Sequence, residues 1–289
     1  MDNITPIFDQ RFELAEGPVW LQGSLWWVDI MAGTLHRWDP RTNSHQVRDT
    51  GDLLGAAVPG NDGRWLLAQN RSLVAFDWEH GTGTVVATLS GEGPRNRCND
   101  GKCDPLGRFW FGTMNMDSVE RAGVLYSFSA SDKCQAKQRE VTISNGLAWS
   151  EDGSAMFYVD SPTRRVDVFN YDLEQGSIHD RRTLIEFGEQ DGWPDGMTID
   201  VDGCLWIAMW GGAKIVVVDS RSGARVREVA MPVSQPTSCT FGGDGLSELF
   251  ITSAWEGMTQ QQREKEPLAG SVFHLPTGSV GLPVERFSF

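Results

Sequence analysis

The 289-residue chain has few cysteines, few basic residues and no long hydrophobic run. Its five cysteines are odd in number and irregularly spaced, and none forms a C-x-x-C pair, which argues against a disulfide framework or a thiolate zinc site. The longest apolar stretches, such as Ile215–Val218, are far too short to span a bilayer. Only 25 Lys and Arg stand against 39 Asp and Glu, a formal charge of −14. This balance argues against a nucleic-acid partner, because nucleic acid attracts basic surfaces.

The segment Met1–Arg11 has no basic start followed by an apolar run, so we expect no secretory signal. We therefore expect a cytoplasmic protein, with no membrane attachment, whose thiols stay reduced. No change in composition marks a domain boundary, and one large all-β domain is compatible with this length. Residues 1–289 are expected to form a single domain that works as a monomer.

What the sequence does contain is a short unit that recurs six times. Each unit has a glycine turn, then an apolar segment, then a second segment of β-branched and aromatic residues. Glycine supplies the positive φ that tight hairpin turns require. The glycines are Gly23, Gly63, Gly107, Gly153, Gly203 and Gly245, and the apolar segments begin at Leu25, Trp65, Phe109, Met156, Leu205 and Leu249, which are 40 to 49 residues apart.

A period of about 40–50 residues built from short strands is typical of a β-propeller blade. Nothing between the units has the pattern of a long amphipathic helix. Six units therefore predict an all-β, six-bladed β-propeller, with a series of hairpins in a β-sandwich as the alternative. The N-terminal segment Ile4–Leu14 is expected to add a strand to the last blade, which closes the ring. The polar stretch Glu256–Glu266 is expected to form a short exposed helix.

The innermost strand of each propeller blade lines a central channel, so equivalent positions of the six units converge there. In the first unit Glu16 lies seven residues before Gly23, one fewer than in the other units, a difference that a β-bulge can absorb. Five of the six units then bring a polar side chain to one level of the channel. The positions eight residues before the other five glycines are Gly55, Asn99, Asn145, Asp195 and Thr237.

Burial alone would favour apolar side chains at this level of the channel, so it does not explain two carboxylates, two carboxamides and a hydroxyl there. An unpartnered buried carboxylate is costly, and Glu16 and Asp195 would repel each other unless a cation lay between them. Oxygen ligands suit hard divalent cations such as Ca²⁺, Mg²⁺ or Mn²⁺. None of the five histidines stands in a metal-binding motif. The sequence thus predicts a divalent-metal site, with a hydrogen-bonded polar plug between the blades as the alternative.

Four motifs in a fixed order carry a family resemblance. They are similar to motifs of the senescence-marker-protein, regucalcin and gluconolactonase family of six-bladed propellers, in an order and spacing that agree over essentially the whole chain. Residues 267–271, together with residues 237–243, resemble the bacterial sugar-lactone hydrolases of that family. The motifs are Glu16–Trp20, Arg97–Lys102, Asn145–Ser150 and Pro194–Met197.

The resemblance implies one divalent metal ion held by Glu16, Asn145 and Asp195, with water or substrate completing its ligands. The ion is left open among Ca²⁺, Mg²⁺, Mn²⁺, Zn²⁺ and Fe²⁺. The resemblance also implies that Asp195 serves in proton transfer and that Arg97 and Asn99 bind the substrate, a small-molecule sugar lactone.

Other residues lie near the expected site. Glu120 matches a family loop position that contacts sugar hydroxyls, although one residue is missing just after it. Trp193 is more simply a blade-packing residue than a face for the sugar ring. The excursion Met114–Ala122 either covers the channel mouth or is a plain surface loop. Cys98 and Cys103 stand where the family usually has other residues, and no role for them follows.

Lactone hydrolysis explains these residue types chemically. The carbonyl oxygen gains negative charge as water attacks, and a metal ion at that oxygen stabilises the charge. The attacking water loses its proton to Asp195, or else a metal-bound hydroxide attacks. The sequence contains no Gly-x-Ser-x-Gly motif, so it does not indicate a covalent acyl-enzyme. We therefore expect hydrolysis of a pentono- or hexonolactone to the aldonic acid; the alternatives are a non-catalytic calcium-binding or scaffold propeller, and a hydrolase of another ester or an organophosphate.

Overall fold

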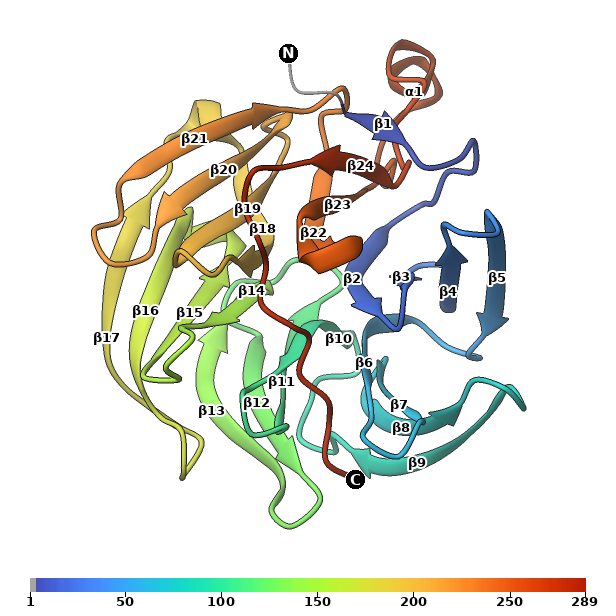
Figure 1. Ribbon diagram of the computed structural model, residues 1–289. Helices are drawn as coiled ribbons and strands as arrows, with labels where there is room; N and C mark the ends of the chain where they lie inside the picture. Colours follow the sequence, from blue (N-terminus) through green and yellow to red (C-terminus); the bar gives the residue numbers. More distant parts are fainter. Residues whose placement is uncertain (1–3) are drawn as a thin grey trace.

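The computed structural model describes residues 4–289, whose strands form six four-stranded antiparallel sheets around a common centre (Figure 1). This confirms the predicted six-bladed β-propeller. In the first five blades the strands follow one another from the channel outward in chain order. Within these residues, no helix is long and apolar enough to cross a membrane.

The blades divide the chain into consecutive segments of similar length. Blades one to three are β2 (Ala15–Leu21), β3 (Ser24–Asp29), β4 (Thr34–Asp39) and β5 (Ser44–Asp49); β6 (Leu54–Pro59), β7 (Trp65–Gln69), β8 (Ser72–Asp77) and β9 (Thr82–Thr88); and β10 (Asn96–Cys103), β11 (Phe109–Asn115), β12 (Gly123–Ser129) and β13 (Lys133–Val141). Blades four to six are β14 (Ser144–Trp149), β15 (Ala155–Asp160), β16 (Arg165–Asp172) and β17 (Ser177–Glu186); β18 (Trp193–Ile199), β19 (Cys204–Trp210), β20 (Lys214–Asp219) and β21 (Arg225–Ala230); and β22 (Pro236–Gly242), β23 (Glu248–Ser253), β24 (Phe273–Pro276) and β1 (Thr5–Pro6). The helices are η1 (Ser161–Thr163), η2 (Glu189–Asp191), η3 (Asp244–Leu246) and α1 (Gln260–Lys265).

The core lies between the blades. The second strand of each blade is covered on both faces by neighbouring sheets, which is why its sequence is a continuous apolar run rather than an alternating one. Trp27, Trp110 and Trp206, one on each of three such strands, are fully buried. The outermost strands face solvent, and β9 is exposed along almost its whole length.

Both ends of the chain help to close the ring. β1 pairs with β24, so the N-terminal segment completes the last blade as predicted. The C-terminal segment crosses one end of the channel (Figure 1) and is held by backbone hydrogen bonds, including Val201 N to Val280 O at 2.9 Å and Phe287 N to Pro59 O at 2.8 Å. The short exposed helix predicted before Pro267 is α1.

Each innermost strand carries a one-residue β-bulge at the level of the predicted channel positions. In β14, Asn145 pairs with Val159 and Leu147 pairs with Tyr158, so Gly146 is the extra residue. The same shift occurs in the other five innermost strands. A bulge bends its strand and redirects side chains, which places it at the right point to build a site.

The seven-residue spacing of Glu16 has a different cause from the one expected. The first blade shares its bulge with the other five, so the bulge does not account for the missing residue, and that interpretation was wrong. The difference lies in the turn instead. Four residues separate the paired Trp20 and Leu25, whereas five separate the paired Cys103 and Phe109.

Candidate functional site

A cavity of about 380 Å³ opens at the end of the channel where the innermost strands begin. Its walls include Glu16 from β2, Arg97 and Asn99 from β10, Asn145 from β14 and Asp195 from β18. Each of these side chains is buried, with 5–6% of its surface exposed. The structure thus brings together five of the six predicted site residues. The first and the last of them, Glu16 and Asp195, are 179 positions apart in the sequence.

The sixth predicted residue is elsewhere. Glu120 is exposed on the loop after β11 and is not among the residues that line the cavity, so the geometry does not support its prediction as a sugar contact. The same loop nevertheless reaches the cavity through Met116 and Ser118, and Met114 at the end of β11 lines it as well. The excursion therefore lies at the channel mouth, and its sequence gave no signal for which of its side chains faces inward.

Trp193 corrects a second expectation. We expected it to pack within the blade, but it lines the cavity and is 41% exposed. The guanidinium of Arg164 lies 4.6 Å from the centre of the indole ring and fixes one side of it. An aromatic ring held in this way at a cavity wall can contact the apolar face of a ligand.

The buried carboxyl groups repel one another. Burial raises the pKa of Glu16 to about 8, with a further contribution from the charge of Asp100. Burial also raises the pKa of Asp195 well above its ordinary value, and the charges of Glu16 and Asp100 add to that effect. The pKa of Asp100 is itself raised by burial, although the ammonium of Lys102 opposes the rise.

In the part of the chain that the structure describes, Glu16 and Asp195 accept backbone hydrogen bonds but lie in no ion pair. Glu16 accepts a hydrogen bond from the backbone N–H of Gly17 at 2.8 Å, and Asp195 accepts one from the backbone N–H of Gly196. Two buried, unpaired carboxylates beside a carboxamide oxygen form a donor set that suits a hard divalent cation. Among the described residues no three Asp, Glu, His or Cys side chains are arranged to hold a metal ion by themselves, and the amide of Asn145 is the predicted third ligand.

Two buried cations border the carboxylates. Arg97 donates from Nη1 to Asn99 Oδ1 at 2.7 Å and to the carbonyl of Cys98 at 2.9 Å. Lys102 donates from Nζ to the carbonyl of Met197 at 2.7 Å, which joins the third blade to the fifth. Burial lowers the pKa of both groups, and the neighbouring carboxylates oppose that change.

Sequence reasoning missed Asp100, Lys102 and Glu256 as members of this environment. Successive residues of a regular strand point to opposite faces, so a regular strand would not bring both Asn99 and Asp100 to the channel. The bulge between Cys98 and Gly101 makes both face inward. Glu256 lines the cavity from the segment after β23, where no strand repeat could place it.

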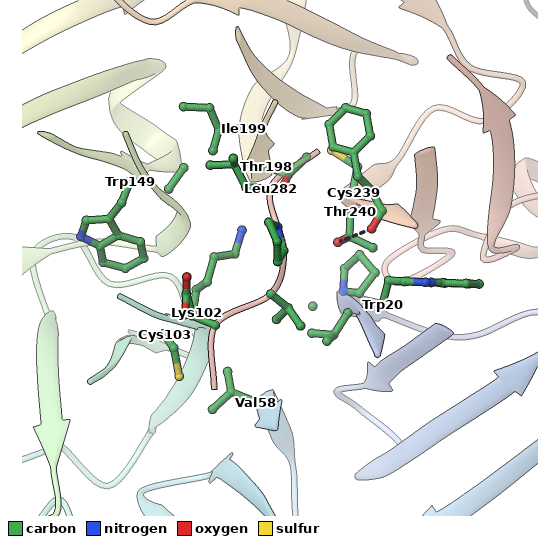
Figure 2. A pocket seen from close by; sticks show the side chains of 18 of the residues that line it. Trp20, Val58, Lys102, Cys103, Trp149, Thr198, Ile199, Cys239, Thr240 and Leu282 are labelled. Atoms are coloured by element: carbon green, nitrogen blue, oxygen red, sulfur yellow. Dashed lines mark hydrogen bonds between the residues drawn. The ribbon is translucent and has the colours of Figure 1, made fainter. Parts of the chain in front are cut away.

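A second cavity of about 300 Å³ lies at the opposite end of the channel, where the innermost strands end. Figure 2 shows the amine of Lys102 pointing into this space, and the C-terminal segment with Leu282 crossing it. Cys103 and Cys239 are buried in its walls, and Cys98 is buried in the core between two blades. All five cysteines are free thiols, and burial raises the pKa of these three, so packing explains their presence.

Comparisons with known proteins cover nearly the whole ring of blades. A family model described as "SMP-30/Gluconolactonase/LRE-like region" matches residues 14–255. Regucalcin from Xenopus laevis is 35% identical over 276 residues, which cover 93% of this chain and 92% of that protein. A structure of regucalcin from Agrobacterium tumefaciens, described as a calcium-binding protein, has a TM-score of 0.94 at 26% identity and covers 98% of this chain and 97% of that chain. A luciferin-regenerating enzyme has a TM-score of 0.93 at 30% identity, with 100% of both chains covered.

Proposed function

The chain belongs to the SMP-30/gluconolactonase/LRE-like family, and on that premise we propose that it is a metal-dependent hydrolase that opens a sugar aldonolactone to the aldonic acid. One observation carries the proposal. Glu16, Asn145 and Asp195 line a single cavity, and within residues 4–289 the two buried carboxylates form no ion pair. Such a set would hold one divalent ion and leave part of its surface open to the cavity.

The ion would polarise the lactone carbonyl and stabilise the negative charge that forms on its oxygen. Asp195 would take a proton from the water whose oxygen bonds to the carbonyl carbon. The ring C–O bond then breaks, and the released hydroxyl oxygen receives that proton. The product is an open-chain hydroxy acid.

We propose that Arg97 and Asn99 orient the substrate, Arg97 with a free donor and Asn99 with the remaining lone pair of its oxygen, because its Nδ2 already donates to Ser144 and Asn145. The Nη1 of Arg97 is committed to neighbouring carbonyl oxygens, whereas within residues 4–289 its Nη2 has no hydrogen-bond partner. A buried guanidinium with a free donor edge suits a carbonyl or hydroxyl oxygen, and it favours an anionic product. Trp193 would contact the apolar face of the sugar ring from the cavity wall.

The cavity and the adjoining channel carry more carboxyl groups than cations. Four carboxyl groups, those of Glu16, Asp100, Asp195 and Glu256, lie with the two cations of Arg97 and Lys102, an excess of two negative charges when all are ionised. A divalent ion would balance this excess, and at the lactone carbonyl it would stabilise the negative charge that develops there.

The test is hydrolysis of a panel of pentono- and hexonolactones by protein treated with a chelator and then supplied with Ca²⁺, Mg²⁺, Mn²⁺, Zn²⁺ or Fe²⁺. We expect turnover that disappears with the chelator and returns with at least one ion. Asp195→Ala should lose activity by roughly 10³-fold or more, the scale of removing a proton acceptor and metal ligand together. The enzyme proposal fails if no lactone is hydrolysed although the wild-type protein is folded and binds a divalent ion.

That last outcome corresponds to the second candidate function, a calcium-binding propeller without catalysis. The structure of the Agrobacterium relative is described as that of a calcium-binding protein, and this description favours the second candidate function. The two functions differ in what Asp195→Asn should do. If the protein is the proposed enzyme, Asp195→Asn abolishes lactone turnover. If it only binds calcium, wild type turns over no lactone, and Asp195→Asn shows its effect only as a weaker Ca²⁺ affinity.

A further inference from the structure

A continuous chain of hydrogen bonds runs around part of the channel wall, through the third, fourth and fifth blades. Arg97 Nη1 donates to Asn99 Oδ1 at 2.7 Å, and Asn99 Nδ2 donates to Asn145 Oδ1 at 3.2 Å. Asn145 Nδ2 donates to the hydroxyl of Ser161 at 2.9 Å, and that hydroxyl donates to the carbonyl of Pro194 at 2.7 Å. The chain ends one residue before Asp195.

The two ends fix the direction of every bond between them. A guanidinium has only donors, and a backbone carbonyl has only acceptors. The hydroxyl of Ser161 must therefore give its proton to Pro194 and accept from the NH₂ group of Asn145. That leaves the oxygen of Asn145 on the side of Asn99, where the cavity lies. The orientation of an Asn amide is normally decided by such a network rather than by its shape.

We propose that Ser161 is the positioning residue of this site: its hydroxyl holds the Asn145 carboxamide with the oxygen toward the cavity, and at the same time fixes the strand that carries Asp195. The inference rests on the proposed metal site. Ser161 itself is 6% exposed and lies in η1, outside the repeated strands, so no repeat position indicated it.

The same principle holds at the other ligands. Thr237 of β22 donates to the carbonyl of Ala15 at 2.6 Å, one residue before Glu16. Asn99 Nδ2 donates to the carbonyl of Ser144 at 2.8 Å, one residue before Asn145. Each of the three ligands therefore follows a carbonyl that a buried polar side chain holds in place. In all three bonds, those of Thr237, Asn99 and Ser161, the donor belongs to the preceding blade of the ring.

Removing the hydroxyl should harm metal binding more than stability. Ser161→Ala leaves the NH₂ group of Asn145 and the carbonyl of Pro194 without partners, and it leaves the Asn145 amide held only by the longer bond from Asn99, at 3.2 Å. A side chain that orients a metal ligand typically changes metal affinity by roughly 10- to 100-fold. Ser161→Thr keeps a hydroxyl, and Ser161→Cys keeps the volume but forms weaker hydrogen bonds.

A matched control is available in the sixth blade. Ser253 is also fully buried, and its hydroxyl donates to the carbonyl of Ser271 at 2.6 Å, but it does not line the cavity. Ser253→Ala removes a bond of the same kind, at a place where no metal ligand depends on it.

The experiment measures Mn²⁺ binding to chelator-treated protein by electron paramagnetic resonance of free Mn²⁺, with urea unfolding recorded for each variant. We expect Ser161→Ala to raise the Kd for Mn²⁺ by roughly 10- to 100-fold, Ser161→Cys to raise it less, and Ser161→Thr and Ser253→Ala to stay within about threefold of wild type. If Ser161→Ala does not fold, the comparison of Ser161→Cys with Ser161→Thr gives the same result.

The proposal is overturned if Ser161→Ala binds Mn²⁺ as tightly as wild type, or if Ser253→Ala weakens binding by the same factor. In both cases lactone turnover by the wild-type protein would leave the proposed function standing. Wild-type protein that binds no divalent ion would remove the metal-dependent function and the role of Ser161 together.

Discussion

Without its metal ion, the protein should lose stability as the pH rises, and Glu16 should cause much of the loss. The folded state raises the pKa of this group from 4.5 to about 8, so the folded protein holds the proton more tightly than the unfolded chain does. The stabilisation is fully present below about pH 4.5 and disappears as the pH rises through about 8. Between pH 5 and pH 8 the protein loses the stabilisation that corresponds to roughly 2.5 pKa units of this difference, which at about 1.4 kcal/mol per unit is about 3–4 kcal/mol.

Urea unfolding of chelator-treated wild type and Glu16→Gln at pH 5, 6, 7 and 8 isolates this effect. Glutamine keeps the size of the side chain but does not titrate. Its neutral amide also removes a charge that raises the pKa of Asp195, so the variant should be flatter in pH from both causes. We expect wild type to lose about 3–4 kcal/mol of unfolding free energy relative to the variant over this range.

Saturating divalent ion reverses the sign of the argument. An ion between the carboxylates favours their charged forms, so wild type should regain stability at high pH while Glu16→Gln gains less. Parallel pH profiles for wild type and Glu16→Gln in the chelator would refute the reasoning. Such a result would mean that Glu16 is neutralised by something other than protonation or a metal ion.

Three further results are expected. Trp193→Ala should raise the KM for a lactone substrate roughly 5- to 10-fold with little change in kcat, because an aromatic contact contributes about 1 kcal/mol to binding; an unchanged KM would remove Trp193 from the site. Gly196→Ala should lower the free energy of unfolding by about 1–3 kcal/mol, measured in urea, because its methyl group would lie 2.1 Å from the hydroxyl of Ser238. Ellman's reagent should modify at most two thiols of the folded protein, those of Cys134 and Cys204, and rapid reaction of a third would contradict the packing described.

The fold could be predicted because local and global signals coincide. The six turn glycines found in the sequence all have positive φ, from 65° at Gly245 to 90° at Gly63. A residue with a side chain is strained in this conformation, so the glycines mark the turns directly. The apolar segments after them became the buried second strands, since strands covered on both faces need no alternation.

The site could be predicted only where it follows the repeat. Counting back from the turn glycines located Asn99, Asn145 and Asp195, because each innermost strand keeps the same length between bulge and turn. Glu256 and Ser161 lie in connections outside the repeat, so no register led to them. Contacts made by loops depend on chain paths that differ from blade to blade, and here sequence spacing carries no information.

At three of the six equivalent channel positions the side chain is not a proposed metal ligand. These positions explain why a six-bladed propeller holds an asymmetric site. At the equivalent position of the second blade, a side chain on Gly55 would lie 2.5 Å from the carbonyl oxygen of Asn99, so the close approach of β6 and β10 excludes a ligand there. In the sixth blade, the hydroxyl of Thr237 is committed to the carbonyl of Ala15 at 2.6 Å and to Thr252 at 2.8 Å. In the third blade, the NH₂ group of Asn99 donates to Ser144 and Asn145 of the fourth blade. The remaining three blades therefore supply the proposed ligands, and the side of the channel that carries none is left for the substrate.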